Sequence, residues 1–137
     1  MEKETPKFEV IVLGIILDSQ KKKILIGKRK KGQGGRKIGW CFPGGRIMPG
    51  EDIDTALKQK IKLKTGYSVK NIGTFFSQTH KESPGLVSIA FLTKVFEGEA
   101  KPGDDIEELK WVSVKELENY FKIPIHKKLK EFLLELV

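Results

Sequence analysis

The sequence predicts an α/β fold in which helices cover both faces of a mixed β-sheet, and three observations support this prediction. Apolar and β-branched runs of strand length alternate with polar turns along most of the chain. A stripe of apolar residues with helical spacing lies in the middle of the chain, and a second stripe lies at its C-terminal end. Helices placed within and after a series of strands indicate a sheet sandwiched between helices.

The first third of the chain predicts strands joined by polar turns. Residues 8–17 are apolar and β-branched, which predicts a buried strand, and a polar turn leads to a short strand at residues 24–27. Residues 27–37 are polar and glycine-rich, so we expect a surface loop that forms a lip over a site. Residues 40–42 predict the end of a further strand, and residues 43–46, Pro-Gly-Gly-Arg, predict a tight turn.

The central helix is predicted to begin at Glu51 or Asp52 and to end at Thr65. Both acids follow a Pro-Gly turn and oppose the positive end of the helix dipole. Gly66 then supplies the left-handed residue with which many helices end. The expected apolar stripe of this helix contains Ile53, Ala56, Leu57, Ile61 and Leu63.

The second half predicts three strands and two helices. The strands are expected at residues 69–77, 86–95 and 109–112, with a turn-rich loop at residues 97–105. Ser113 and Glu116 fit a capping box for a small helix that runs through Tyr120. Pro124 is expected to open a last amphipathic helix that continues to the C-terminus, with His126 in its first turn.

Composition and charge limit the class of protein. A chain of 137 residues predicts a single domain, residues 1–137. The lone Cys41, the absence of an apolar run of roughly 18 residues and the lack of a signal-peptide pattern together predict a cytoplasmic protein with no membrane partner. The net charge of +8 favours anionic small molecules, whereas lysines spread without interleaved aromatic residues disfavour nucleic acid.

The segment from Trp40 to Tyr67 resembles a Nudix box. The pattern of that family is a glycine, five residues, a glutamate, seven residues, and then Arg-Glu-apolar-x-Glu-Glu-x-Gly-apolar. Gly45 and Glu51 match its opening, and Gly66 and Tyr67 match its close at the right spacing. The resemblance covers nearly the whole chain and implies an α/β/α sandwich, as the strand and helix patterns do. Many members of the family are homodimers, although no interface is marked in this sequence.

The acids that bind metal in the Nudix pattern are replaced here by Lys60, Leu63 and Lys64. Helix positions three and four apart share a face, so glutamates there would converge on Mg²⁺. Three carboxylates would carry −3, whereas two lysines and a leucine carry +2, which repels a divalent cation. Glu51 remains as the candidate metal ligand, and because a lone carboxylate holds Mg²⁺ poorly, a Mg²⁺ cofactor is weakly supported.

The chain also resembles GDP-mannose mannosyl hydrolase, an atypical Nudix branch whose box is itself partly degenerate. The likeness runs through residues 25–31, 39–46 and 104–117. In that branch water attacks the sugar carbon, so fewer metal ligands are needed, and arginines that match Arg29 and Arg46 contact the diphosphate. The resemblance therefore implies a nucleoside diphosphate derivative, such as a nucleotide-sugar, as the ligand.

This sequence departs from that branch at two places. The branch keeps one box glutamate where Lys64 stands, and its histidine base in the late loop has no histidine counterpart here. Asp104 and Asp105 are the nearest candidates for a general base, although acids in such a loop also cap turns. His80 we interpret as an ordinary hydrogen-bonded histidine.

Several residues of the box have both a structural and a functional interpretation. Gly44 and Gly45 form either a plain connection or a turn whose backbone, with Arg46, binds phosphate or metal. Trp40 is positioned to stack on a base beside such a site. The two box lysines are either solvated helix residues or direct ligands of phosphate oxygens.

Two hypotheses from different classes remain at this point. One is a Nudix-type hydrolase with an impaired or unusual metal requirement, in which Arg29 and Arg46 stabilise diphosphate charge. The other is a catalytically inactive Nudix-fold module that binds a nucleotide without turning it over. The box positions 60, 63 and 64 favour the second, and the retained glycines and arginines favour the first.

Overall fold

The structure is a computed structural model that describes residues 7–30, 39–122 and 124–136. Residues 27–29 of the predicted lip at 27–37 are instead the end of a strand, and residues 31–37 lie outside these ranges. The elements, in chain order, are β1 (Glu9–Asp18), β2 (Lys23–Arg29), β3 (Trp40–Cys41), β4 (Gly44–Ile47), α1 (Ile53–Thr65), β5 (Tyr67–His80), β6 (Ser83–Gly98), β7 (Ile106–Ser113), a 3₁₀ turn η1 (Val114–Glu116), α2 (Leu117–Tyr120) and α3 (Lys127–Glu135).

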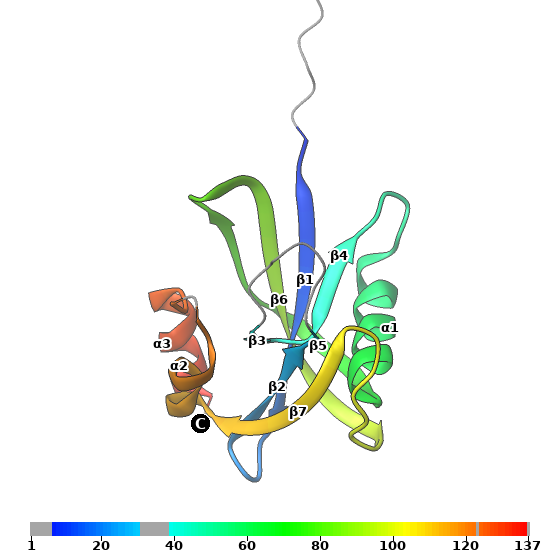
Figure 1. The fold of residues 1–137 in the computed structure, drawn as a ribbon, viewed down its shortest axis with the longest axis vertical. Coiled ribbons are helices and arrows are strands. Elements are labelled where there is room, and N and C mark those ends of the chain that lie inside the picture. Colours follow the sequence, from blue (N-terminus) through cyan, green and yellow to red (C-terminus); the bar gives the residue numbers. More distant parts are fainter. Residues whose placement is uncertain (1–6, 31–38, 123, 137) are drawn as a thin grey trace, which may run out of the picture.

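The strands form one mixed sheet between two layers of helix. The main strand order is β3-β2-β1-β6-β5, with β4 paired to β1 and β7 paired to β2. Strands β1 and β6 are parallel, and the remaining pairs are antiparallel. Helix α1 lies on one side of the sheet, and α2 and α3 lie on the opposite side (Figure 1). The predicted α/β/α sandwich with a mixed sheet is therefore confirmed.

Strand β1 contributes to a core on each face because its side chains alternate. Val12 and Ile16 pack with Leu57 and Ile61 of α1, and all four are fully buried. Ile15 points to the other face, where it belongs to the cluster beneath α2 and α3. Each helical layer is thus fixed to the same strand from its own side.

Helix α1 begins and ends as the sequence predicts. The Asp52 carboxylate accepts a hydrogen bond from the Thr55 amide at 2.9 Å, and Gly66 adopts φ 82° at the C-cap. The stripe differs from the prediction at two positions, since Ile53 in the first turn is 42% exposed and Leu63 is 60% exposed. Because the Leu63 side chain is exposed, packing gives no reason for a leucine at this box position.

The glycine-rich segment 43–46 is not the tight turn that the sequence predicts. Gly44–Ile47 instead form strand β4, which pairs with residues 10–13 of β1. Glycine is required here for space, because a Cβ atom on Gly44 would lie 2.0 Å from the Val12 carbonyl oxygen. The glycines therefore allow β4 to approach β1 closely and bring the start of the box onto the central sheet.

Substituting Gly44→Ala should destabilise the fold by about 1–3 kcal/mol, because the added methyl group overlaps backbone that cannot move aside easily. Chemical denaturation would measure the loss. Gly39→Ala is the matched control, since a Cβ there meets only Lys122 side-chain carbons at 3.9 Å or more. Equal stabilities of the two variants would contradict this account of β4.

Other elements differ from the predictions mainly in length. Strands β5 and β6 extend well beyond the expected ranges, because their backbones pair through polar ends, with bulges at several points. The last helix begins at Lys127 rather than at Pro124, and His126 is its N-cap, with Nδ1 accepting from the Lys128 amide at 3.1 Å. The capping interaction of Ser113 with Glu116 is present.

No helix in the described part of the chain is long and apolar enough to cross a membrane.

Candidate functional site

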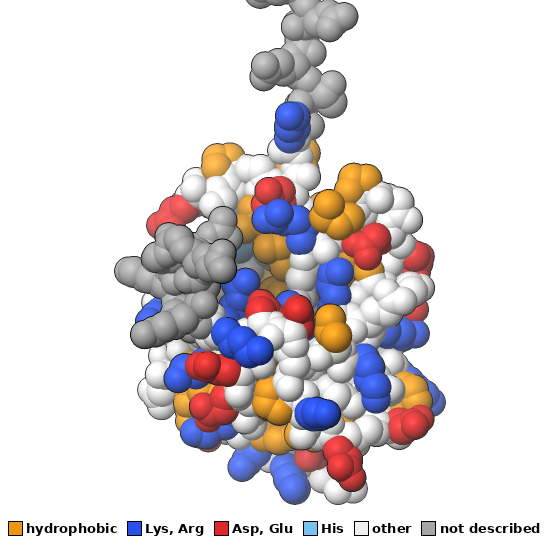
Figure 2. Space-filling view, turned by 45° about the vertical axis from the view of Figure 1, so that its right-hand side comes forward, with side chains coloured by type: hydrophobic (Ala, Val, Ile, Leu, Met, Phe, Trp, Pro, Cys, Tyr) orange, Lys and Arg blue, Asp and Glu red, His pale blue; other side chains and the backbone are white. Residues whose placement is uncertain are grey.

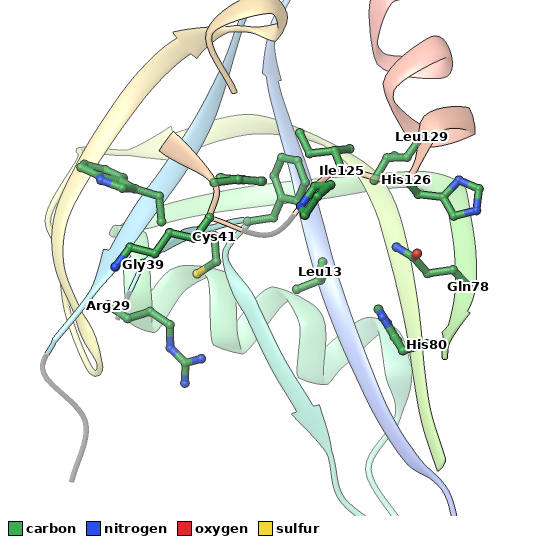
Figure 3. A pocket seen from close by; sticks show the side chains of 14 residues that line it. Leu13, Arg29, Gly39, Cys41, Gln78, His80, Ile125, His126 and Leu129 are labelled. Carbon is green, nitrogen blue, oxygen red and sulfur yellow. The ribbon is translucent and has the colours of Figure 1, made fainter. Parts of the chain in front are cut away.

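A cavity of about 390 Å³ lies on the face of the sheet that α3 covers. Strands β1, β2, β3 and β5 form one wall, and residues 121, 122 and 124–129 form the other (Figure 3). Half of its lining residues are large and apolar: Leu13, Trp40, Phe42, Phe121, Pro124, Ile125 and Leu129. A cavity of this size with a few polar groups is typical of a site for a small molecule.

The aromatic side chains of the cavity are held by neighbouring rings. Trp40 meets the ring of Tyr120 edge-on, with centroids 5.3 Å apart, and Phe42 meets Phe121 in the same manner at 4.9 Å. These contacts fix rigid apolar surfaces on β3 and beside it. Such surfaces suit a planar base, as the sequence predicts for Trp40.

Polar groups enter the cavity from β5. Gln78 and His80 extend from that strand toward the cavity interior (Figure 3). His80 Nε2 lies 2.7 Å from the Ser88 hydroxyl oxygen, so its ring is oriented by a hydrogen bond. Among the described residues, no aspartate or glutamate lines the cavity.

Arg29 connects the cavity to a group of charged side chains that we call the Lys64 cluster: Arg29, Lys64, Asp105 and the Gly44 carbonyl. Arg29 Nε donates to Asp105 Oδ2 at 3.2 Å. Lys64 Nζ donates to the Gly44 carbonyl oxygen at 2.6 Å and lies 3.1 Å from Asp105 Oδ1. The Lys64 side chain is only 13% exposed, so its ammonium is held inside the site rather than in solvent.

The two cations keep Asp105 ionised. Burial alone would raise the pKa of the Asp105 carboxyl group, but the Lys64 ammonium and then the Arg29 guanidinium outweigh burial. The pKa therefore lies below its ordinary value of 3.8. A carboxylate stabilised in this way is a weak proton acceptor at neutral pH.

Cys41 adds no charge to this region. Burial raises the pKa of the Cys41 thiol, while the nearby Arg29 and Lys64 act in the lowering direction without overcoming burial. The thiol is therefore neutral at pH 7 and contributes to the cavity wall as a small apolar group.

A second pair of box residues, Glu51 before α1 and Lys60 within it, lies near β4. Lys60 Nζ is 3.9 Å from Glu51 Oε2, and Glu51 Oε1 accepts from the Met48 amide at 2.7 Å. The Lys60 side chain also crosses Gly45, whose ideal Cβ position is 3.2 Å from Lys60 Cδ. Glu51 thus closes the turn between β4 and α1 and pairs with a cation.

These residues do not fit a divalent metal. The helix face that would carry carboxylates carries the Lys60 and Lys64 ammonium groups, and the Gly44 carbonyl already accepts from one of them. The described residues contain no group of three His, Cys, Asp or Glu side chains able to share an ion. The Lys60 ammonium beside the Glu51 carboxylate and the Lys64 ammonium at the Gly44 carbonyl oppose Mg²⁺ binding there.

The structure separates residues that the sequence treats together. Asp105 belongs to the Lys64 cluster, whereas Asp104 is an exposed turn residue with φ 52°. Arg29 lines the cavity, whereas Arg46 Nη2 pairs with Glu9 Oε2 at 3.1 Å on the outer part of β4. Asp105 and Arg29 therefore lie at or beside the cavity, whereas Asp104 and Arg46 do not line it.

Sequence reasoning missed the contributions of Gln78 and of residues 121, 122 and 124–129. No motif marks Gln78, and only the register of β5 against β6, in which it pairs with Ser88, brings it to the cavity. Phe121 and Ile125, in the connection between α2 and α3, are predicted as core residues by any hydrophobicity scale. Their position opposite β3 follows from tertiary packing.

The NUDIX domain family model matches residues 7–136 of this chain. An ADP-ribose pyrophosphatase of Methanocaldococcus jannaschii is 34% identical over 113 residues, which are 79% of this chain and 63% of the relative. A putative nudix hydrolase 1 of Caenorhabditis elegans is 31% identical over 96 residues, 69% of this chain and 25% of the relative. The chain thus spans less than two thirds of the length of each relative.

Solved structures share the fold. A MutT structure from work on Aliivibrio salmonicida and Vibrio cholerae superposes with a TM-score of 0.76 at 25% identity, covering 94% of this chain and 99% of that chain. A NUDIX hydrolase from Nitrosomonas europaea gives a TM-score of 0.79 at 19% identity, covering 96% and 73%. The match to the family model over nearly the whole chain shows that this protein belongs to the Nudix family.

Proposed function

We propose that this Nudix protein binds a nucleoside diphosphate derivative, with the base in the cavity and the diphosphate at Arg29, and that metal-dependent hydrolysis there is impaired. The observation that carries the proposal is the continuity of an apolar, aromatic cavity with the Lys64 cluster. A base requires an apolar surface and a diphosphate requires cations, and Arg29 belongs to both. Lys60 and Lys64 supply positive charge that can neutralise the diphosphate without a bound metal.

The polar lining of the cavity supports an adenine base. The Gln78 amide both donates and accepts, which matches the N6 and N7 edge of adenine. Guanine presents adjacent N–H donors, which a carboxylate would accept best, and no carboxylate lines the described cavity. The ADP-ribose pyrophosphatase relative agrees with an ADP-linked ligand, whereas the resemblance to GDP-mannose mannosyl hydrolase favours a GDP-linked sugar.

The base preference can be tested at Gln78. Wild-type protein should bind ADP more tightly than GDP by about tenfold, the value of one good bidentate base contact. Gln78→Glu should reverse or abolish this preference, because a carboxylate accepts from guanine and repels the adenine N7 lone pair. Isothermal titration of both nucleotides measures it, and Gln20→Glu, in the turn between β1 and β2, is the control. If Gln78→Glu left the ratio of ADP to GDP affinity unchanged, Gln78 would not be the residue that recognises the base.

Binding and turnover are separated by one panel experiment. ADP-ribose, ADP, GDP-mannose and GDP are incubated with the protein, with Mg²⁺ or with a chelator, while heat of binding and free sugar, nucleotide and phosphate are measured. We expect saturable binding that the chelator leaves intact. If none of the four compounds binds saturably, the proposal is refuted. Turnover that the chelator abolishes would refute the claim that the site works without metal.

Hydrolysis at the sugar carbon is the second candidate function. It requires a base to activate water, and Asp105 is the carboxylate beside the cavity. Its lowered pKa and its two cationic partners argue against that role. Asp104 lies exposed in the turn and would act only on a ligand that reaches out of the cavity. Binding without hydrolysis is therefore the function that we propose first.

A further inference from the structure

The Asp105 carboxylate occupies the space between the two best-placed cations of the site. Its Oδ2 accepts from Arg29 and its Oδ1 faces Lys64, so each oxygen serves one cation. Two oxygens of a phosphate group bound by the same two side chains would take the same positions. The carboxylate and the ligand therefore compete for one place.

We infer that Asp105 is an internal counter-ion that holds the diphosphate subsite in the ligand-free protein, and that the incoming diphosphate displaces it from Arg29 and Lys64. The inference rests on the proposed function for the identity of the natural ligand. Asp105 would keep the two cations in place when no ligand or metal is bound, and the diphosphate would have to replace its carboxylate to enter.

Lys64 has the placement of a tethered cation. The Gly44 carbonyl accepts from its ammonium at 2.6 Å, and the helix carries it at a position where the Nudix pattern has a glutamate. An ammonium has three donors, and the described residues engage it at two places, Gly44 and Asp105. If Asp105 leaves, Gly44 still holds Lys64 in the site, with donors aimed at an anion.

The pairing of Asp105 with Lys64 is imperfect. Asp105 Oδ1 is buried and has no hydrogen bond of good geometry among the described residues, although Lys64 Nζ is 3.1 Å away. The contact is therefore an ion pair that is poorly aligned as a hydrogen bond. An incoming phosphate, with more oxygens and more charge, can satisfy both cations better than this carboxylate does.

Only the Asp105 side chain needs to move. Its backbone is fixed, because its carbonyl oxygen accepts from the Lys30 amide at 2.7 Å. The preceding loop is tied to the end of α1, where the Gly103 amide donates to the Lys64 carbonyl at 3.1 Å. Rotation about the side-chain torsions releases both cations without unfolding the loop, and the Asp105 side chain is 34% exposed, which gives it an exit to water.

The test uses inorganic pyrophosphate as the probe, titrated calorimetrically in chelator at physiological salt. Asp105→Asn keeps the shape and removes the charge, so pyrophosphate should bind at least about tenfold more tightly than to wild type, since a like charge against the ligand is lost. Glu107→Gln removes the same charge two residues away, from an ion pair with Lys28 outside the site, and should match wild type. Adding Lys64→Met to Asp105→Asn should cancel the gain.

Pyrophosphate affinity in Asp105→Asn that is no higher than in Glu107→Gln would overturn the inference. A measurement on unmodified protein covers the case in which the variant does not fold. The carboxyl ¹³C resonance of Asp105 should shift when pyrophosphate binds, and a resonance that stays fixed through saturation would equally overturn it. If no variant binds ADP more tightly than pyrophosphate, the proposed base site and with it the proposed function are refuted. The counter-ion inference is tested independently, by the pyrophosphate measurements alone.

Discussion

Replacing Lys60, Leu63 and Lys64 together by glutamate should give this protein a Mg²⁺ site. Lys60 and Lys64 lie on the side of α1 that faces β4, and residue 63 is adjacent to both on the helix surface. The three carboxylates can therefore converge there, and the formal charge would change from +2 to −3. Removing Lys64 also frees the Gly44 carbonyl, an oxygen that Mg²⁺ accepts as a ligand. Without metal the three acids repel one another, so the melting temperature should fall, and Mg²⁺ should raise it again.

The control for this experiment is Lys58→Glu, Gln59→Glu and Lys62→Glu on the same helix. It makes the same change, from +2 to −3, and its acids are also three and four residues apart. With Mg²⁺ at ten times its dissociation constant, linkage gives about 1.4 kcal/mol of added stability to the first variant. The control should gain markedly less. Equal responses would show that bulk charge, rather than the Gly44 carbonyl and the box geometry, governs metal binding.

The sequence predicted the frame of the fold because local rules determine it. Asp52 caps α1 and Gly66 ends it, as caps and left-handed glycines do in most contexts. The β1 run is too apolar for anything but a buried strand, and it lies at the centre of the sheet. These features depend on residues that are neighbours in the chain.

The segment 43–46 was mispredicted because glycine has two uses. Local backbone preferences predict a turn for Pro-Gly-Gly. At Gly44, however, the missing Cβ allows β4 to lie close to β1. That requirement exists only once the strands are paired. No property of the four residues alone distinguishes the two.

The site was predicted in part. Box spacing identified Lys64, and the resemblance identified Arg29, but their meeting at Asp105 joins residues 29, 64 and 105 through tertiary structure. The sequence placed Arg29 and Arg46 in one role, and their contacts differ, since Arg46 pairs with Glu9. The cavity depends on Phe121 and Gln78, which carry no motif.

Substituting Arg29→Met should weaken ADP binding by about 10- to 100-fold, the value of a lost hydrogen bond to a charged group at about 1.5–3 kcal/mol. Arg29 is the cation that both lines the cavity and reaches the Lys64 cluster, so under the proposed function it is the residue that joins the base site to the diphosphate site. Its side chain is 58% exposed, so the fold should lose little stability. Isothermal titration with ADP and with pyrophosphate measures the effect.

Two comparison variants give this result its meaning. Lys28→Met removes the same charge from the neighbouring position of β2, where the side chain pairs with Glu107 at 3.7 Å instead of lining the cavity, and it should leave ADP affinity within about twofold. Arg29→Lys keeps the charge but loses the planar fork, so it should recover only part of the affinity. If Lys28→Met weakened binding as much as Arg29→Met, net charge alone would explain affinity. The cavity and the Lys64 cluster would then have no claim to be a specific site, because any basic surface of this +8 chain, whose charges are interspersed over the face shown in Figure 2, would serve equally well.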